Sequence, residues 1–288
     1  MEQGKQIQWF PGHMAKTRRK ITEDLKLVDI AAEIVDARIP GSSANPILRD
    51  IVKSKPKLLL LNKCDLADMN QTNRWIQKMK DKGETAVAID AKSGKGIPAF
   101  YAAVQDVLKD QIQAWRNKGL VGRPVRIMVL GIPNVGKSSL INRMLLGSGA
   151  GKAEVRDKPG VTRQNRWFAL KKGFELLDTP GVLWPKFEDE KVGRLLAYTG
   201  AVKDEILDLQ GLAGGLLELI YSLYPGAIDE RYKTQLTDGM KGHEILEEIG
   251  KKRGMLISGG EIDMERAAVT VLDEFRGGKL GRLSLEQV

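Results

Sequence analysis

Cysteine is almost absent from this chain, because Cys64 is the single one among 288 residues. One cysteine cannot form an internal disulfide, so a disulfide framework is excluded and the chain fits a reducing compartment, the cytoplasm. Long apolar runs are also missing, since no stretch approaches the length of a membrane span. No segment combines a charged start, an apolar middle and a small-residue cleavage site. We therefore expect a cytoplasmic protein without a membrane anchor.

Acidic residues are fewer than basic ones, with 37 Asp and Glu against 46 Lys and Arg, which gives a formal net charge of +9. A basic balance favours anionic partners, and nucleic acid is the first of them. Solubility alone is the alternative interpretation of the same charge. Internal repeats and low-complexity tracts are lacking as well. The length is sufficient for two domains.

Short apolar runs alternate with helical stretches over most of the chain. Strands are predicted at residues 29–36, 57–62, 85–90, 125–131 and 174–178, with a partner strand near 166–171 and helices near 70–82, 98–117 and 137–146. This alternation predicts a doubly wound, mainly parallel α/β sheet with helices on both faces. Ligands of such sheets lie at the carboxyl ends of the strands, where the motifs described below fall.

The pattern changes from residue 188 onward. Helical candidates follow near residues 189–199, 203–222, 242–252 and 263–276, separated by Gly and Pro. They predict a small all-α domain. We therefore expect two domains, at residues 1–187 and 188–288, and the first includes a basic N-terminal segment, residues 1–28.

A glycine-rich loop, Gly131-Ile-Pro-Asn-Val-Gly-Lys-Ser138, follows one predicted strand and opens a helix, which is the context of a phosphate-binding loop. Glycine lets the backbone approach phosphate closely, and successive N–H groups and the helix N-terminus face the anion. Lys137 is expected to neutralise the β- and γ-phosphates, and the Ser138 hydroxyl to bind Mg²⁺. Nucleotide contacts are predicted for Asn134, Val135, Gly136, Lys137, Ser138 and Ser139.

A second motif, Asp178-Thr-Pro-Gly181, ends a later strand. Asp178 is expected to hold Mg²⁺ through water, and the Gly181 N–H to sense the γ-phosphate. Thr162 lies between the phosphate loop and Asp178, and it is our candidate for the switch threonine that closes on Mg²⁺. An ordinary loop threonine is the alternative. Together these residues predict a nucleoside triphosphate bound with magnesium.

A tetrapeptide that reads guanine, Asn62-Lys63-Cys64-Asp65, ends another apolar strand. The Asp65 carboxylate can accept from both N1–H and N2–H of guanine. Adenine lacks this donor pair, so an ATPase is disfavoured. Lys63 is expected to lie along the base, and Asn62 to tie this loop to the phosphate loop. All four residues, Cys64 included, are predicted to contact the nucleotide.

The next strand ends in Asp90-Ala91-Lys92, which resembles the Ser-Ala-Lys element whose backbone N–H contacts the guanine oxygen. We predict nucleotide contacts for these three residues. Asp90 replaces the serine, so the bracing that serine normally gives is not predicted here. The backbone role of Ala91 does not depend on that replacement.

The base-reading tetrapeptide precedes the phosphate loop, whereas it follows in an ordinary GTPase. In this order the motifs resemble those of the circularly permuted GTPases. Further segments at residues 8–16, 36–40, 183–190, 251–254 and 258–260 make the chain similar to the ribosome biogenesis GTPase A (YlqF) group, over essentially its whole length. The resemblance implies a permuted Ras-like P-loop fold, GTP and GDP as ligands, and a role in late assembly of the large (50S) ribosomal subunit.

The catalytic group is not evident from the motifs. Many GTPases place a water-orienting glutamine after the Asp-x-x-Gly motif, but Val182 stands here and cannot position water. His13 is our candidate, because imidazole orients water or accepts a proton near neutral pH. An ordinary loop histidine, or one that stacks on RNA, is the alternative. We expect the chain by itself to hydrolyse GTP slowly, and the ribosomal particle to stimulate this hydrolysis.

Potassium is a further candidate ligand. Asn134 stands where potassium-dependent relatives carry an asparagine that binds K⁺. An asparagine in a turn that bonds to its local backbone is the alternative.

Two basic segments suit RNA, because they combine cations for phosphate with, in the first case, aromatic rings for stacking. They are residues 9–20, with Trp9 and Phe10, and residues 251–253. A solvated face is the alternative for each.

The sequence favours a monomeric factor that binds rRNA and the large-subunit precursor in a GTP-dependent way. A GTPase switch that recruits proteins without binding RNA is the second hypothesis. A metabolic enzyme that uses an NTP, such as a kinase, is the third hypothesis. It would need a pocket for an acceptor, and the sequence shows no group of acidic or thiol residues for one.

Overall fold

The structure is a computed structural model that describes residues 11–147, 167–170, 173–177, 189–202 and 204–288. The side chains of residues 11–17 and 206 also lie outside the description. Within the described residues, no helix is both long and apolar enough to span a bilayer.

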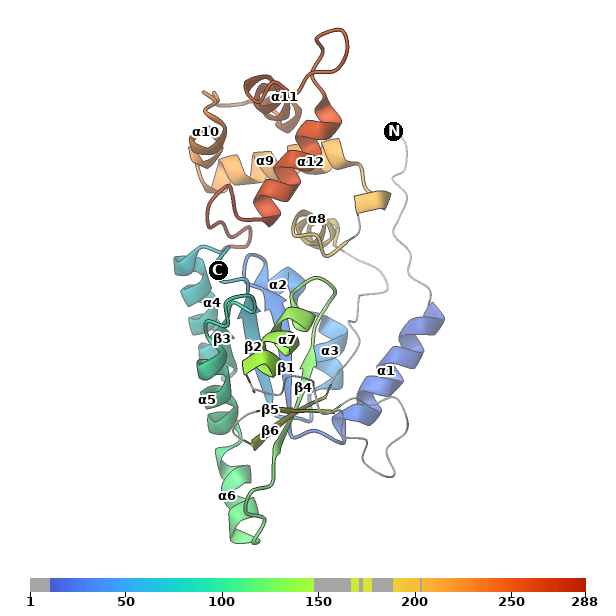
Figure 1. Cartoon of the computed structure of the whole chain (residues 1–288), viewed down its shortest axis with the longest axis vertical. Helices are drawn as coiled ribbons and strands as arrows, with labels where there is room; N and C mark the ends of the chain where they lie inside the picture. The colour runs from blue at the N-terminus through green and yellow to red at the C-terminus, as the bar shows by residue number, and fades with distance from the viewer. Residues whose placement is uncertain (1–10, 148–166, 171–172, 178–188, 203) are drawn as a thin grey trace.

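A six-stranded sheet forms the centre of the larger part, in the order β3-β2-β1-β4-β6-β5 (Figure 1). The strands are β1 (Ile30–Asp36), β2 (Lys57–Asn62), β3 (Thr85–Ala88), β4 (Val125–Leu130), β5 (Trp167–Leu170) and β6 (Phe174–Leu177). All neighbours pair in parallel except β5, which is antiparallel to β6. The predicted mainly parallel sheet is confirmed, and so is the partner strand predicted near residues 166–171.

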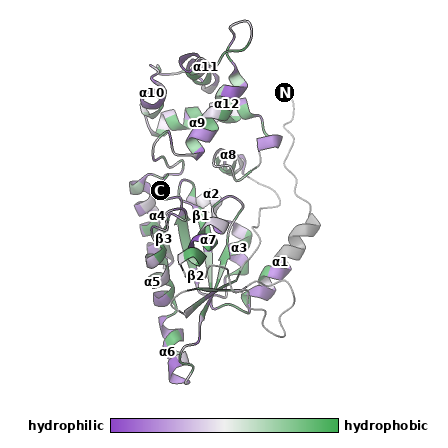
Figure 2. Cartoon of the chain, in the orientation of Figure 1, coloured by the Kyte–Doolittle hydropathy of each residue, from purple (hydrophilic) through white to green (hydrophobic). Residues whose placement is uncertain are grey.

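Helices cover both faces of the sheet, because its strands carry apolar side chains on both sides. Figure 2 colours the chain by the hydropathy of each residue. One face packs on α5 (Ile97–Val107) and α7 (Lys137–Gly147), and the other on α1 (Pro11–Leu25), α3 (Pro46–Ile51) and α4 (Met69–Asp81). Leu60 on the first face and Leu61 on the second are both 0% exposed. The doubly wound architecture is therefore confirmed.

Three local features differ from the sequence-based prediction. The helix predicted at 98–117 is divided into α5 and α6 (Lys109–Asn117) at Leu108, which is buried in the core while α6 buries none of its residues. Two short helices, α2 (Pro40–Ser43) and α3, were not predicted. Both have proline in the first turn, where its missing N–H costs nothing. The Pro-Gly-His segment, expected in a loop, instead begins α1 at Pro11.

The C-terminal part is helical, as predicted, but the helix at Ala227–Tyr232 was not predicted and the helix expected from residue 203 begins at Leu209. It contains α8 (Glu190–Tyr198), a 3₁₀ turn (Asp204–Ile206), α9 (Leu209–Leu223), α10 (Ala227–Tyr232), α11 (Gly242–Lys252) and α12 (Met264–Arg276). α9 packs against the other four helices (Figure 1). At its crossing with α11 the backbones nearly touch, since a Cβ on Gly242 would lie 2.2 Å from the carbonyl oxygen of Gly214. Only glycine fits at this crossing.

Candidate nucleotide-binding site

Four of the predicted motif segments meet at one edge of the sheet. Asp36 and Asn62 are paired in register at the ends of β1 and β2. Asp90 follows β3, and Gly131 directly follows β4. The strands are neighbours in the order β3-β2-β1-β4. Parallel strands end at the same edge, so the segments that follow them lie side by side, where such folds bind ligands.

The phosphate loop has the backbone that its sequence predicts. Asn134 and Gly136 have positive φ angles of 61° and 99°, and α7 begins at Lys137. A Cβ on Gly136 would lie 2.2 Å from the Asn62 amide nitrogen, so the position requires glycine for its dihedral and for the close approach. Ser138 and Ser139 are exposed in the first turn of α7. The loop is thus shaped to surround an anion at a helix N-terminus.

Asn62 links three loops through one buried side chain. Its amide nitrogen donates to the carbonyl oxygen of Val135 at 2.6 Å, which is the predicted tie to the phosphate loop. Its amide oxygen accepts from the Ala91 N–H at 3.0 Å. The N–H that the sequence assigns to the guanine oxygen is therefore bonded to Asn62 here. Asn62 is 2% exposed, so a substitution would leave buried polar groups unpaired.

Asp90 takes over the bracing that serine gives in the related element. Its carboxylate accepts from the Lys92 N–H at 2.8 Å. Burial raises the pKa of Asp90, but hydrogen bonds from Ser93 and Lys92 outweigh it, and the pKa is lowered. The charged carboxylate therefore stabilises the turn after β3.

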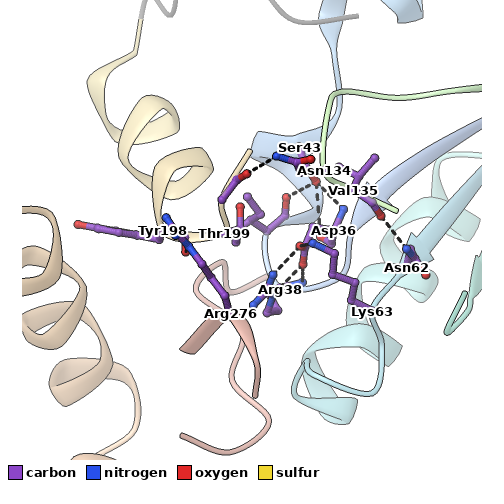
Figure 3. A network of polar contacts seen from close by, with 12 residues as sticks. Asp36, Arg38, Ser43, Asn62, Lys63, Asn134, Val135, Tyr198, Thr199 and Arg276 are labelled. Carbon is purple, nitrogen blue, oxygen red and sulfur yellow. Dashed lines mark hydrogen bonds and ion pairs between the residues drawn. The ribbon is translucent and has the colours of Figure 1, made fainter. Parts of the chain in front are cut away.

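The base-reading loop presents Asp65 to solvent and turns Lys63 inward. Asp65 is exposed and Cys64 is buried. Lys63 has a positive φ of 61°, and its ammonium group lies 2.9 Å from Oδ2 of Asp36. Lys63, predicted to lie along the base, is therefore held by Asp36 in this structure (Figure 3).

Asp36 and Arg38 form a buried ion pair. Nε of Arg38 donates to Oδ1 of Asp36 at 2.9 Å, and Nη2 donates to Oδ2 at 2.8 Å. Each residue is 1% exposed. Burial raises the pKa of Asp36, but the charges of Arg38 and Lys63 lower it by more, so the net effect holds the pKa below its ordinary value of 3.8. In the sequence, residues 36–40 are only a mark of resemblance, and the ion pair was not predicted. A charged pair directly after a buried strand was the available signal.

We expect Asp36→Ala to lower the free energy of unfolding by about 3–5 kcal/mol, because it leaves the buried guanidinium of Arg38 without its counter-charge. Urea unfolding measures the effect. The control is the double variant Asp36→Ala/Arg38→Met, which removes both charges and should be more stable than the single variant. Equal stability of the single variant and the unaltered chain would contradict the prediction.

Low pH should weaken the same ion pair, Asp36 with Arg38. The pKa of Asp36 is lower in the folded chain, so its contribution to stability is complete above the ordinary value of 3.8 and is lost as the pH falls towards the folded value. The free energy of unfolding should therefore decrease below about pH 4, and less so in the double variant.

Asn134 links the phosphate loop to the helical part. Its side-chain amide donates to the carbonyl oxygen of Gly200 at 2.7 Å, just after α8. Arg276, at the end of α12, holds this turn by donating to the carbonyl oxygens of Ala197 at 2.9 Å and Tyr198 at 3.2 Å (Figure 3). Gly200 is distant in sequence, so this bond is not the local backbone bond considered for Asn134.

Several predicted residues lie outside the description. Thr162, Asp178 and Gly181 are among them, and so is the side chain of His13, although its backbone belongs to α1. Their predicted roles stay predictions.

The second basic segment, residues 251–253, is largely engaged within the chain. Lys251 forms an ion pair of 2.7 Å with Glu247, and Arg253 approaches Glu274 at 3.6 Å and lies over the ring of Tyr232. Lys252 is exposed. In the first segment, Arg18 and Arg19 are exposed, and the pair of Arg19 with Glu23 is at the surface. Lys251 and Arg253 are exposed as well, so both segments present cationic side chains to solvent.

Comparison with known proteins agrees with this geometry. A family model described as 50S ribosome-binding GTPase matches residues 126–213. Ribosome biogenesis GTPase A of Bacillus cereus is 46% identical over 281 residues, which cover 97% of this chain and 93% of that protein. A GDP-bound structure titled TM YlqF has a TM-score of 0.65 and 25% identity, covering 93% of this chain and 99% of that one. A GNP-bound YlqF from T. maritima has a TM-score of 0.63 at 25% identity, covering 94% and 98%.

Proposed function

The chain belongs to the ribosome biogenesis GTPase A family, and on that premise we propose that it binds GTP at the four strand ends and hydrolyses it during assembly of the large ribosomal subunit. The cytoplasm is the compartment in which we propose that it acts. GTP and GDP are its expected ligands, since the family is one of GTPases.

The observation that carries this proposal is the position of Asn62. One buried side chain holds the phosphate loop through Val135 and the element after β3 through Ala91, and it begins the base-reading tetrapeptide. A site that must hold a guanine and a chain of phosphates together needs its loops at a fixed spacing. Asn62 provides that spacing, and it supports a single nucleotide across the three loops.

Magnesium fits the donor set at the phosphate loop. The hydroxyl of Ser138 is exposed in the first turn of α7, beside the loop that surrounds the phosphates. The ion would be held by Ser138 together with phosphate oxygens, Asp178 and Thr162, and it would neutralise charge on the β- and γ-phosphates. Potassium is proposed as a ligand of Asn134. The side-chain oxygen of Asn134 would be the K⁺ ligand, while its amide nitrogen bonds to the Gly200 carbonyl oxygen.

We divide the protein at residues 187/188 into the permuted GTPase domain and the helical domain. The N-terminal segment, residues 9–20, is proposed as an rRNA contact, and its Arg18 and Arg19 are exposed. Residues 251–253 are proposed as a second contact, and all three of these basic residues are exposed.

Binding to large-subunit precursors is expected to require the GTP state. The chain should co-sediment with 50S precursors in a non-hydrolysable GTP analogue and much less in GDP. Replacing Arg18 and Arg19 by Gln should weaken the binding and flatten its steep salt dependence, because fewer phosphate contacts are made. The control is Arg74→Gln/Arg266→Gln, at two exposed positions elsewhere.

Two results would count against this proposal. Equal sedimentation in GTP analogue and GDP would remove the nucleotide switch. Binding that is indifferent to salt and to the Arg18/Arg19 replacement would favour the second hypothesis, a GTPase that recruits protein partners without touching RNA.

A further inference from the structure

The chain beyond α12 returns from the helical part to the nucleotide edge of the sheet (Figure 1). Residues Leu283, Ser284 and Leu285 are buried there, although the segment has neither helix nor strand. Ser284 is fixed to Tyr224, the residue that caps the C-terminus of α9, because its N–H donates to the Tyr224 hydroxyl at 3.0 Å and its carbonyl oxygen accepts from that hydroxyl at 3.1 Å. We call residues 282–286 the tail clamp.

The tail clamp binds the backbone of the guanine-reading loop at alternate residues. Nη2 of Arg282 donates to the carbonyl oxygen of Cys64 at 2.9 Å. The N–H of Leu283 donates to the carbonyl oxygen of Leu66 at 3.0 Å. Asp65, the predicted base reader, therefore lies between two residues that the tail clamp holds.

A third bond continues the series past the loop. The N–H of Asp68, the residue that caps α4, donates to the hydroxyl of Ser284 at 3.1 Å. Three consecutive residues of the tail clamp thus fix the loop from Cys64 to the start of α4.

The same segment also covers the Asp36–Arg38 pair behind Lys63. The carbonyl oxygen of Arg38 accepts from the N–H groups of Leu285 at 2.9 Å and Glu286 at 3.3 Å. The Glu286 carboxylate accepts from the N–H groups of Gly41 at 2.7 Å and Ser42 at 2.9 Å. The tail clamp therefore contacts the loop that carries Asp65 and also Arg38, the partner of the Asp36 carboxylate that holds Lys63.

We propose that the tail clamp positions the guanine-reading loop, with Arg282 as a positioning residue that sets the place of Asp65 and so the selectivity of the site for guanine. The inference rests on the proposed role of Asp65 as the base reader. Arg282 acts through the backbone of Cys64, to whose carbonyl oxygen it donates. Because the segment is continuous with α12, movement of the helical part changes the hold of the site on the base.

The test is the affinity of the full chain for GDP and for inosine diphosphate, which lacks the 2-amino group that Asp65 is expected to bind. Arg282→Gln should weaken GDP binding about fivefold, a common size for coupling between contacts. Binding of inosine diphosphate should be weakened less, so the ratio of the affinity for GDP to that for inosine diphosphate should fall. Arg282→Lys keeps a cationic donor and should restore part of the ratio.

Arg266→Gln is the matched control, because it removes the same charge from an exposed position on α12. If Arg282→Gln gives the same two affinities as this control, the inference is overturned. The variant Asp65→Asn distinguishes that failure from failure of the proposed function. If this variant keeps its preference for guanosine diphosphate over xanthosine diphosphate, Asp65 does not read the base.

A second measurement needs no substitution. Coupling between two sites is reciprocal, so GDP binding should slow hydrogen exchange at the N–H groups of Leu283 and Leu285. Exchange at these two groups that is the same with and without saturating GDP would contradict the inference.

Discussion

GTP hydrolysis by this chain is expected to accelerate about 10³- to 10⁵-fold when purified large ribosomal subunits are added. The reason is that the position after the Asp-x-x-Gly motif holds Val182, whose side chain cannot orient the attacking water. GTPases without a group that completes the site in place depend on activators for this part of the barrier. Release of phosphate in single turnovers, with and without subunits, measures the effect.

Two variants and an exchange of cations test which groups contribute to hydrolysis and to its stimulation. Lys137→Ala should abolish both slow and stimulated hydrolysis, because it removes the cation of the phosphate loop. His13→Ala should abolish stimulation and leave GTP binding unchanged if the imidazole supplies the missing group. Full stimulation in that variant would reject His13. Replacing K⁺ by Na⁺ should slow turnover, and unchanged turnover would remove Asn134 as a potassium ligand.

The second large expected effect concerns recognition of the guanine base by Asp65. Asp65→Asn is expected to weaken GTP and GDP binding by about 10²- to 10⁴-fold, because two charge-assisted hydrogen bonds to guanine are lost. Xanthine nucleotides should gain, since the amide offers a donor to the oxygen that replaces the 2-amino group. Competition between GDP and xanthosine diphosphate for the site measures the exchange of preference.

A matched replacement tests whether charge alone is responsible. Asp106→Asn makes the same change at an exposed position on α5 and should leave both affinities as they are. Unaltered GDP affinity in the Asp65 variant would show that another residue reads the base.

The fold was largely predictable because its signals are local. The apolar runs at residues 57–62 and 125–131 are long enough to identify buried strands, and the alternation with helices determines the parallel sheet. The break at Leu108 was not predictable, because helical periodicity runs through it and only packing of the core divides the helix. The short helix α3 was marked by Asn45 and Pro46, a signal that apolar periodicity does not detect.

The site was predictable where a motif specifies a partner. Asn62 contacts Val135 as the tetrapeptide predicts, because the strands that carry the two loops end at the same edge. The link from Asn134 to Gly200 was not predictable, since it depends on where the helical part packs. Arg282 gave no signal either, because a short segment without periodicity acquires its role only through residues far away in sequence.

The distance between Arg282 and Cys64 also has a consequence for synthesis. The two residues are 218 positions apart, so the loop is synthesised long before the residue that holds it. Both nucleotide loops emerge from the ribosome before residues 282–286 do. A nascent chain can form the sheet while its guanine loop is still unclamped, and the loop is held only once residues 282–286 have emerged and packed.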